Sequence, residues 1–407
     1  MKRVIVGLLG ICVGLVCLGI LRAEDKLEQR VEDKRGDISG PVGQGLYTKP
    51  VWRKMGHGTY VGGYADFQYR NQQDAKQKFD VARLVPFIYA DIAPGLRFAT
   101  EIEFEHGGVN DEGEVGVDTT TGKGSASLSG ESKIEFAVLD YEILQESLAL
   151  RAGIVLIPIG KFNSIHDSPI NDLNDRPLVS QFILPTTFSE SGAGLFGTVY
   201  PFDPLKLDYQ FYLTQGFNGG SDGSKIKKSS GLRDARSSLS SDNNESFGYT
   251  GRLGISPFLG NEIGLSFYSG NYDDAGQNAL TILALDWGFQ WKFVELLGEY
   301  ANAQIGKSPA ITASVPERME GYYGQVNVHF LQDLVRKDSV FTGVARWDDY
   351  NTDLRDPTND KQRLTFGINF RPLEQTVFKI DYQINYEDRA VNRVQNNALV
   401  LGFATYF

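Results

Sequence analysis

Apolar and polar residues alternate one by one along much of this chain, in segments that turn-forming residues separate. The clearest case lies near the C-terminus, where five apolar residues alternate with four polar ones over residues 378–386. Because successive side chains of a β-strand point to opposite faces, this pattern predicts a strand with one apolar and one polar face. Residues 363–371 alternate in the same way.

Sixteen segments of this kind follow one another, and most are ten to fourteen residues long. They lie near residues 58–70, 78–92, 96–106, 132–143, 147–157, 192–200, 205–215, 246–255, 261–269, 279–289, 292–304, 319–330, 338–348, 361–371, 376–386 and 396–407. A strand of twelve residues is about 40 Å long at roughly 3.3 Å per residue. Tilted by about 40°, it crosses the apolar band of an outer membrane, which is about 25 Å tall. The segments predict an all-β fold, a transmembrane, antiparallel up-and-down β-barrel of about sixteen strands.

Short and long connections alternate between these segments. The short ones lie near residues 93–95, 144–146, 201–204, 256–260, 290, 331–337 and 372–375, and the long ones near 71–77, 107–131, 158–191, 216–245, 270–278, 305–318, 349–360 and 387–395. An up-and-down barrel with tight periplasmic turns and long outer loops has this rhythm, and a soluble β-sandwich does not. The Gly- and Ser-rich stretches 219–225 and 237–244 predict solvated, mobile loops.

The N-terminal segment differs from the rest of the chain. Two basic residues precede a long uncharged run within residues 1–23, and a charged stretch follows Ala23. This arrangement predicts a secretory signal peptide that is cleaved near Ala23. A membrane anchor is the alternative, because the run approaches the length of a span. Lipidation of Cys17 is a further alternative, but Val16 stands where a small residue is expected.

Three parts of the chain follow from these patterns. Residues 1–23 form the predicted signal peptide, residues 24–57 a periplasmic N-terminal leader without a strand pattern, and residues 58–407 the outer-membrane β-barrel. Both cysteines lie in the signal peptide, so the mature chain would have no disulfide and no thiolate. Cleavage would leave 37 of the 40 basic residues beside 51 acidic ones, a net charge of −14. We therefore expect no nucleic-acid partner.

The connection at 158–191 differs from the other long ones because it is rich in Ile, Leu and Phe. Such apolar residues would be poorly placed in a loop that merely extends into water. If the connection folds back against the inner wall, its charged residues would constrict the pore. The predicted constriction residues are Lys161, His166, Asp167, Asp172, Asp175 and Arg176. The alternative is an ordered external lid with these charges in solvent.

Charged residues recur on the predicted inward faces of the strands. The predicted lumen-wall residues are Arg97, Glu101, Glu103, Glu105, Arg151, Arg252, Arg346, Arg363, Lys379 and Asp381, with Asp208, Glu295 and Glu299 beside them. The row of three glutamates from residue 101 to 105 could attract cations or bind Ca²⁺ at the outer mouth. The simpler expectation is that these carboxylates pair with arginines on neighbouring strands.

Four stretches resemble outer-membrane porins of the phosphate-selective porin O and P-like superfamily. They are residues 83–91, residues 101–108, the connection at 158–185 and the aromatic C-terminus. The resemblance spans most of the barrel and implies a sixteen-stranded barrel, usually trimeric, with the third long loop folded inward. The sequence departs from the phosphate-selective members, because its inward charges are mixed and form no ladder of lysines or arginines. Phosphate selectivity is therefore not expected.

Aromatic residues mark the predicted strand ends. The last segment ends with Phe403 and Phe407 on one face, which resembles the C-terminal signal that the barrel-assembly machinery reads. The alternative is an edge strand that merely closes a sheet. Interfacial girdles would account for the aromatic residues near strand ends, although some of them are expected to be lumen or core residues instead; they are Tyr60, Tyr64, Tyr69, Trp287, Trp291, Tyr322, Tyr323, Trp347 and Tyr350.

Catalytic and metal sites find little support in the sequence. The nearest catalytic set joins His166 to Asp167, Ser164 and Ser168, but neighbouring residues on an extended loop point apart and no nucleophile motif surrounds them. The four histidines are widely separated, which argues against a Zn²⁺ site. We expect neither enzymatic activity nor a cofactor or metal.

The sequence thus predicts a homotrimeric porin of the bacterial outer membrane, surrounded by lipid, that passes small hydrophilic solutes and ions by passive diffusion. Sixteen strands normally enclose an aqueous channel. The negative charge of the mature chain favours cations. A porin selective for anions, phosphate or carbohydrate is the alternative, and a barrel hydrolase or an adhesin is less expected.

Overall fold

The computed structural model describes residues 53–55, 58–107, 130–387 and 396–407. The predicted signal peptide, its two cysteines and the predicted leader up to residue 52 lie outside the described residues. Among the residues that are described, no helix is both long and apolar enough to cross a membrane.

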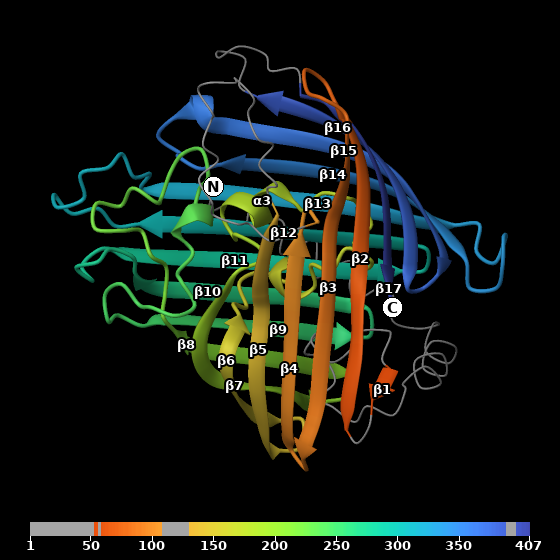
Figure 1. Ribbon diagram of the computed structural model, residues 1–407, viewed down its shortest axis with the longest axis horizontal. Coiled ribbons are helices and arrows are strands. Elements are labelled where there is room, and N and C mark those ends of the chain that lie inside the picture. Colours follow the sequence, from red (N-terminus) through yellow and green to blue (C-terminus); the bar gives the residue numbers. More distant parts are fainter. Residues whose placement is uncertain (1–52, 56–57, 108–129, 388–395) are drawn as a thin grey trace, which may run out of the picture. The chain divides into compact units, whose positions relative to one another are not determined.

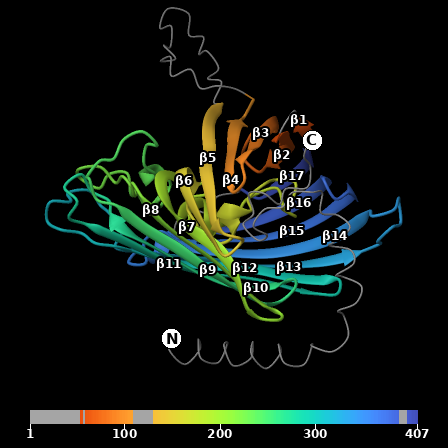
Figure 2. The ribbon, with the colours of Figure 1, turned by 90° about the horizontal axis from the view of Figure 1, so that it is seen from below.

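The described chain forms one antiparallel meander of long strands (Figure 1). After the short β1 (Arg53–Met55), the wall consists of β2 (Thr59–Gln72), β3 (Lys78–Ala93), β4 (Leu96–Glu105), β5 (Glu131–Leu144), β6 (Leu148–Leu156), β7 (Ser189–Phe202), β8 (Leu205–Thr214), β9 (Gly248–Phe258), β10 (Asn261–Asn271), β11 (Ala279–Trp291), β12 (Val294–Ile305), β13 (Arg318–Phe330), β14 (Val340–Asn351), β15 (Asp360–Leu373), β16 (Thr376–Glu387) and β17 (Ala398–Tyr406). Each strand pairs with the next, and β17 pairs with β2. The barrel is therefore closed, and Figure 2 shows its wall curving from β2 and β17 round to β9 and β10.

The sixteen predicted segments correspond to β2–β17, so the predicted fold is confirmed. The additional β1 lies inside the segment assigned to the leader and pairs with residues 59–61 of β2. It continues the edge of β2 beyond the end of β17, whose last pair joins Tyr406 to Tyr64.

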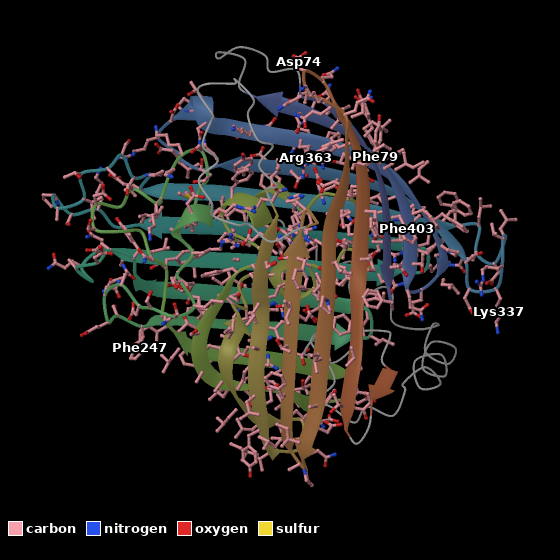
Figure 3. All side chains as sticks on the ribbon, viewed as in Figure 1. Asp74, Phe79, Phe247, Lys337, Arg363 and Phe403 are labelled. Carbon is pink, nitrogen blue, oxygen red and sulfur yellow. The ribbon has the colours of Figure 1, made fainter. Side chains whose placement is uncertain are left out.

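Burial in the barrel is inverted relative to a soluble protein. On β16 the apolar Phe378, Ile380 and Tyr382 are exposed, whereas Lys379 and Asp381 between them are buried. The same contrast holds on β15, where Phe366 and Ile368 are exposed and Arg363 is buried; Figure 3 shows the side chains, with Phe403 on the outer side of β17. A continuous apolar outer surface of this kind is stable only against acyl chains. The polar inner face follows from the same alternation.

Connections at one end of the barrel are shorter than those at the other end, with one exception. Six connections at one end contain only two or three residues, between β3 and β4, β5 and β6, β7 and β8, β9 and β10, β11 and β12, and β15 and β16. The seventh, between β13 and β14, contains nine residues, 331–339. The opposite end carries the long connections, as the alternation in the sequence predicts.

The C-terminus closes the barrel against a glycine. Phe407 and Gly63 exchange two backbone hydrogen bonds of 2.9 and 3.1 Å. A Cβ atom on Gly63 would come within 2.6 Å of the Phe407 ring and 2.8 Å of the Val85 carbonyl oxygen, so only glycine leaves room here. Phe403 packs on the outer surface between Phe67 and Phe378.

The Gly- and Ser-rich stretches 219–225 and 237–244 are mostly exposed or half-buried, but the rest of the β8–β9 connection also contributes to the interior. Phe217, Ile226 and Leu232, which lie outside these stretches, are buried in a core that includes Tyr268 and Tyr272. Three of the aromatic residues predicted for the girdles, Tyr64, Tyr323 and Tyr350, are also buried on the inward side. The alternation of apolar and polar residues assigns each side chain to one of two faces. These three tyrosines lie on the inner face of the barrel, not on the lipid-facing surface where a girdle would be.

Candidate functional site

The connection between β6 and β7, residues 157–188, is a structured segment whose buried apolar residues share one core with side chains of the barrel strands. It contains the 3₁₀ turn η1 (Phe162–Ser164) and the short helix α3 (Leu178–Phe182). Asn163 closes its base: the side-chain amide donates to the carbonyls of Ile157 and Phe188, and its oxygen accepts from the Phe188 amide. These contacts hold the two ends of the segment together, at Ile157 and Phe188, where no strand pairing does so.

The first part of the segment contacts β10 and β12. The Gly160 amide donates to Ser266 Oγ at 2.9 Å, and the Phe162 amide donates to Glu299 at 2.5 Å. Lys161 forms an ion pair of 3.2 Å with Glu262 and keeps 34% of its side chain exposed, more than any other predicted constriction residue for which an ion pair is found. Its side chain is therefore the most accessible of these charged groups.

His166 and Asp167 are buried. The Nε2 atom of His166 lies 3.2 Å from a Glu135 oxygen and 3.3 Å from Thr187 Oγ1, and its Nδ1 lies 2.9 Å from the Asn163 carbonyl. Asp167 accepts a hydrogen bond of 2.8 Å from Tyr406. The histidine thus faces a glutamate and a threonine, and the catalytic set considered from the sequence, with Ser164, Asp167 and Ser168, is not brought together.

Asp172 ties the middle of the segment to two strands. Its carboxylate accepts from Arg371 at 3.0 Å, from Asn327 at 2.7 Å and from Asn369 at 3.1 Å. The donors belong to β13 and β15, and Arg371 also donates to the backbone carbonyls of Pro169 and Ile170. Asp172 is therefore an anchor rather than a free charge.

Asp175 forms the densest ionic contact of the segment. It pairs with Arg70 of β2 and with Arg363 of β15 at 3.5 Å, and it accepts from Gln383 of β16 at 2.7 Å. Burial raises its pKa, but the two guanidinium groups outweigh burial and lower the pKa of Asp175 to about 2. The carboxylate stays ionised at any ordinary pH.

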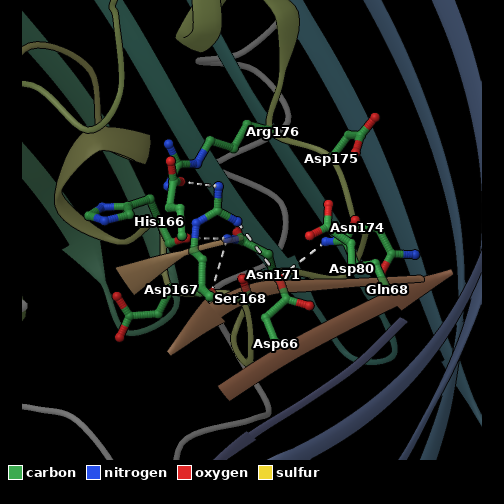
Figure 4. Close-up of polar contacts among 12 residues, drawn as sticks. Asp66, Gln68, Asp80, His166, Asp167, Ser168, Asn171, Asn174, Asp175 and Arg176 are labelled. Carbon is green, nitrogen blue, oxygen red and sulfur yellow. Dashed lines mark hydrogen bonds and ion pairs between the residues drawn. The ribbon is translucent and has the colours of Figure 1, made fainter. Parts of the chain in front are cut away.

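Arg176, which Figure 4 labels next to Asp175, contacts a glutamate of β4. Its guanidinium lies 3.7 Å from Glu103 and donates to the Thr186 carbonyl at 2.9 Å. Glu103 also pairs with Arg83 at 2.9 Å and with Lys133 at 3.0 Å, while Arg83 reaches Glu105 at 3.0 Å. Two of the three glutamates in the row, Glu103 and Glu105, thus pair with basic residues, as the simpler expectation held for them.

Lys379, Asp381 and Arg346 hold the backbone of the same segment. The Lys379 ammonium donates to the carbonyls of Ser168 and Leu173, at 2.7 and 3.2 Å. Asp381 accepts from the Asn174 amide at 2.5 Å, and Arg346 donates to the Asp175 carbonyl at 3.0 Å. These strand residues therefore satisfy groups that an irregular backbone leaves open.

The remaining predicted wall residues bond to other strand residues, two of which, Glu262 and Asn327, also contact the segment. Arg151 binds Asp140 through two hydrogen bonds of 2.7 and 2.8 Å and lies over the Phe196 ring. Arg252 pairs with Asp286 and Glu262, and Arg97, near a short turn, lies 3.4 Å from Asp91. Glu101 is buried, and the Tyr89 hydroxyl donates to it at 3.5 Å. Asp208 pairs with Lys206 at 2.6 Å, and Glu295 accepts from Asn327 at 2.7 Å.

Sequence reasoning missed the partners of these charges. Arg70, Arg83, Glu135, Asp348 and Arg371 contact the segment or its ion pairs, yet none was among the predicted site residues. The inward register of Arg70, Asp348 and Arg371 was readable from the alternation, since each shares parity with a buried polar residue of its own strand. What the alternation does not contain is which strand position lies opposite which residue of the segment.

No group of three or more His, Cys, Asp or Glu residues that could hold a metal ion occurs in the part of the chain that is described. The carboxylates named above instead have arginine, lysine or amide partners, and such neutralised sites offer little affinity for Ca²⁺. Charged groups of both signs thus line the interior and connect the 157–188 segment to the strands.

A closed barrel of sixteen long strands, apolar outside and polar within, defines an outer-membrane β-barrel of the porin type. No protein-family model matches the chain. A relative from Aquifex aeolicus (strain VF5), described as an uncharacterized protein, is 27% identical over 391 residues and covers 89% of this chain and 83% of the relative.

Solved structures with the same fold are outer-membrane porins and channels. OmpF of Salmonella typhi, solved in complex with daunomycin, matches with a TM-score of 0.54 and 12% identity over 88% of this chain and all of that one. An anion-selective porin from Comamonas acidovorans matches at 0.52, with 11% identity over 86% and 99%. The outer-membrane channel DcaP of Acinetobacter baumannii matches at 0.51, with 11% identity over 87% and 99%. These likenesses show the fold; the superfamily named from the sequence stays a prediction.

Proposed function

We propose that this protein is a porin through which small hydrophilic solutes and ions cross the outer membrane by passive diffusion. The proposal rests on one observation, the closed wall of sixteen strands whose outer face is apolar and whose inner face is charged on every side. A barrel of this size is too wide for wall side chains alone to fill. Passage needs no energy source and no chemical step.

The segment at 157–188 is the proposed constriction. Its polar groups bond to inward-facing side chains of β2, β4, β5, β10 and β12–β17, which supports a position across the lumen. An external lid would contact the barrel only at the end that carries the long connections, whereas Asp172 contacts Asn327 and Arg371 near the opposite end of β13 and β15. Predicted constriction charges are mostly paired, so size exclusion contributes more to selection than charge does.

Ion preference is proposed to be weak and toward cations. The net charge of −14 beyond residue 23 attracts cations to the protein. The interior adds little to this preference, because its carboxylates are matched by arginines and lysines at 2.5–3.7 Å. Selectivity for anions, phosphate or carbohydrate remains the second candidate, supported only by the resemblance read from the sequence.

Export, assembly and oligomeric state complete the proposal. Cleavage of residues 1–23 would deliver the chain to the periplasm, and Phe403 with Phe407 would present the C-terminal signal to the barrel-assembly machinery. A homotrimer follows from the family resemblance. Cross-linking of the protein in native membranes tests the trimer, and a monomer-only pattern would overturn it.

Reconstitution into planar bilayers tests the function. We expect stepwise conductance that scales with salt concentration. We also expect that the effect of neutral sugars on this conductance does not saturate as the sugar concentration rises. A correctly folded barrel that never conducts would overturn the porin, and saturation by one solute would favour the selective alternative. Reversal potentials in a salt gradient measure the ion preference.

A charge reversal separates the constriction from the external lid. Lys161→Glu should shift the reversal potential toward cations, because the ammonium group is partly exposed on the segment. Lys227→Glu is the matched control, since Lys227 is 52% exposed on the β8–β9 connection. Equal shifts in the two variants would overturn the constriction.

A further inference from the structure

The connection between β13 and β14, residues 331–339, departs from the construction of its end of the barrel. The six other connections there contain two or three residues, and this one contains nine. Residues 331–338 are all exposed, and Lys337 lies at the far right edge of the molecule in Figure 3. Because two or three residues are enough to connect neighbouring strands at this end, the additional residues of the β13–β14 turn are not needed to connect β13 to β14.

The β13–β14 turn carries large apolar side chains outward. Leu334 and Val335 at its tip are 63% and 62% exposed, and Leu331 at its base is also exposed. The neighbouring β11–β12 turn adds Trp291, 65% exposed, and Phe293. The two turns are adjacent, because the His329 amide donates to the Phe293 carbonyl at 2.8 Å.

The turn is rigidly built. The Asp333 amide donates to the Ser339 carbonyl at 2.8 Å, and the Asp338 amide donates to the Asp333 carboxylate at 2.6 Å. Ser339 Oγ accepts from the Arg336 amide and donates to the Arg336 carbonyl. The tip is therefore presented in one conformation, which lowers the entropy cost of docking.

Cations surround these apolar side chains. Arg336 and Lys337 follow Val335 directly and are exposed, and the Lys292 ammonium lies 5.1 Å from the centre of the Trp291 ring. Two carboxylates oppose the three cations, and one of them, on Asp333, is bound to a backbone amide. Apolar groups beside basic ones are the pattern by which proteins bind the interface of an anionic bilayer.

We propose that the β13–β14 turn, together with residues 291–293, docks on the periplasmic leaflet of the outer membrane and binds its anionic phosphate headgroups. Leu334 and Val335 enter the acyl boundary, and Arg336, Lys337 and Lys292 pair with phosphates. The strands are tilted in barrels of this type by about 40°, so a turn that extends them runs obliquely along the leaflet and not straight into water. The proposal concerns lipid contact and is independent of conductance.

A soluble partner or a second copy of the chain would require a different surface. Protein interfaces are depleted in lysine at their centre, whereas this surface places Lys337 and Lys292 close to its apolar side chains. Charge complementarity favours phosphate, and the continuity of Trp291 and Phe293 with the apolar outer wall favours lipid.

Site-directed labelling tests the proposal. Because both cysteines of the sequence precede residue 24, single-cysteine variants carry one label each. Leu334→Cys, with an environment-sensitive fluorophore, is compared in nanodiscs with Leu283→Cys on the apolar wall and with Asp74→Cys on an exposed connection of the other end. The lipids are zwitterionic phosphatidylcholine alone, or the same with phosphatidylglycerol.

In phosphatidylglycerol discs, we expect the Leu334→Cys label to emit like the Leu283→Cys label and to be quenched by brominated acyl chains. Adding Arg336→Gln and Lys337→Gln should reduce this quenching at least threefold and remove its dependence on anionic lipid. Emission like that of the Asp74→Cys label, or quenching that is equal in both lipid mixtures, would overturn the proposal. Heat-modifiable migration in gels confirms that each variant has folded.

Discussion

Replacement of Asp175 by Asn tests whether ion pairs hold the 157–188 segment in place. The substitution keeps the shape of the side chain and removes its charge. Arg70 and Arg363 then lose their partner, although Arg363 keeps Asp348 at 3.5 Å and the Arg176 carbonyl at 2.9 Å. The Gln383 hydrogen bond can persist, because an amide oxygen accepts as a carboxylate does.

The magnitude follows from how buried the pair is. Removing one member of a fully buried ion pair costs about 3–5 kcal/mol, and an exposed pair contributes about 0–1 kcal/mol. Asp175 and Arg70 are 19% and 21% exposed, whereas Arg363 is 5% exposed, so the contact lies between these limits. We expect a loss of about 2 kcal/mol in local stability, which corresponds to roughly a thirtyfold change in an equilibrium constant.

Hydrogen exchange measures this loss directly. Amides of residues 172–178 should exchange roughly thirtyfold faster in Asp175→Asn, while amides of β8 and β9 should be unchanged. Single-channel recordings should show more frequent current fluctuations at the same time. Exchange at the wild-type rate, in a variant that folds and conducts, would refute the idea that this ion pair holds the segment.

Three other outcomes are expected. The folded pKa of Asp175 is about 2, below its usual 3.8, so the stabilisation is complete above about pH 4 and is lost as the pH falls toward 2; acid titration of segment exchange should show this in the wild type and not in Asp175→Asn. Gly63→Val should lower the yield of folded barrel by displacing Phe407, whereas Gly324→Ala, with no atom within 4 Å of the place its methyl group would occupy, should assemble normally. Leu283→Arg, on the apolar wall, should destabilise the barrel in lipid by about 2–4 kcal/mol in equilibrium unfolding, and a neutral result would contradict the assigned lipid face.

The fold was largely predictable because the alternation of apolar and polar residues within each strand identifies its lipid-facing and its inward side without reference to the rest of the chain. Alternation placed strands at 376–386 and 361–371, and the structure extends these by at most two residues at either end. The three-residue β1 escaped because it pairs with only three positions of β2 and has no alternation of its own. The number of strands led us to expect a closed barrel, but no single residue of β17 or β2 identified the other strand as its partner.

The interior was predictable only in part. The sequence marked the 157–188 segment through its apolar residues, and it placed Arg363 and Asp381 on the inward face. It did not predict that Asp175 would meet Arg70, because these residues are 105 positions apart and their encounter depends on how the segment crosses the barrel. Pairing of this kind is fixed by three-dimensional register, which local patterns do not encode.

The hydrogen bonds between β17 and β2 join the first and the last long strand of the described residues, which are far apart in the sequence. A chain without β17 would therefore leave both edges of the sheet open, even with every other hairpin formed, and unpaired edges invite aggregation. The amides and carbonyls of these two edges are shielded from the hydrocarbon only when β2 and β17 have both been made and have paired.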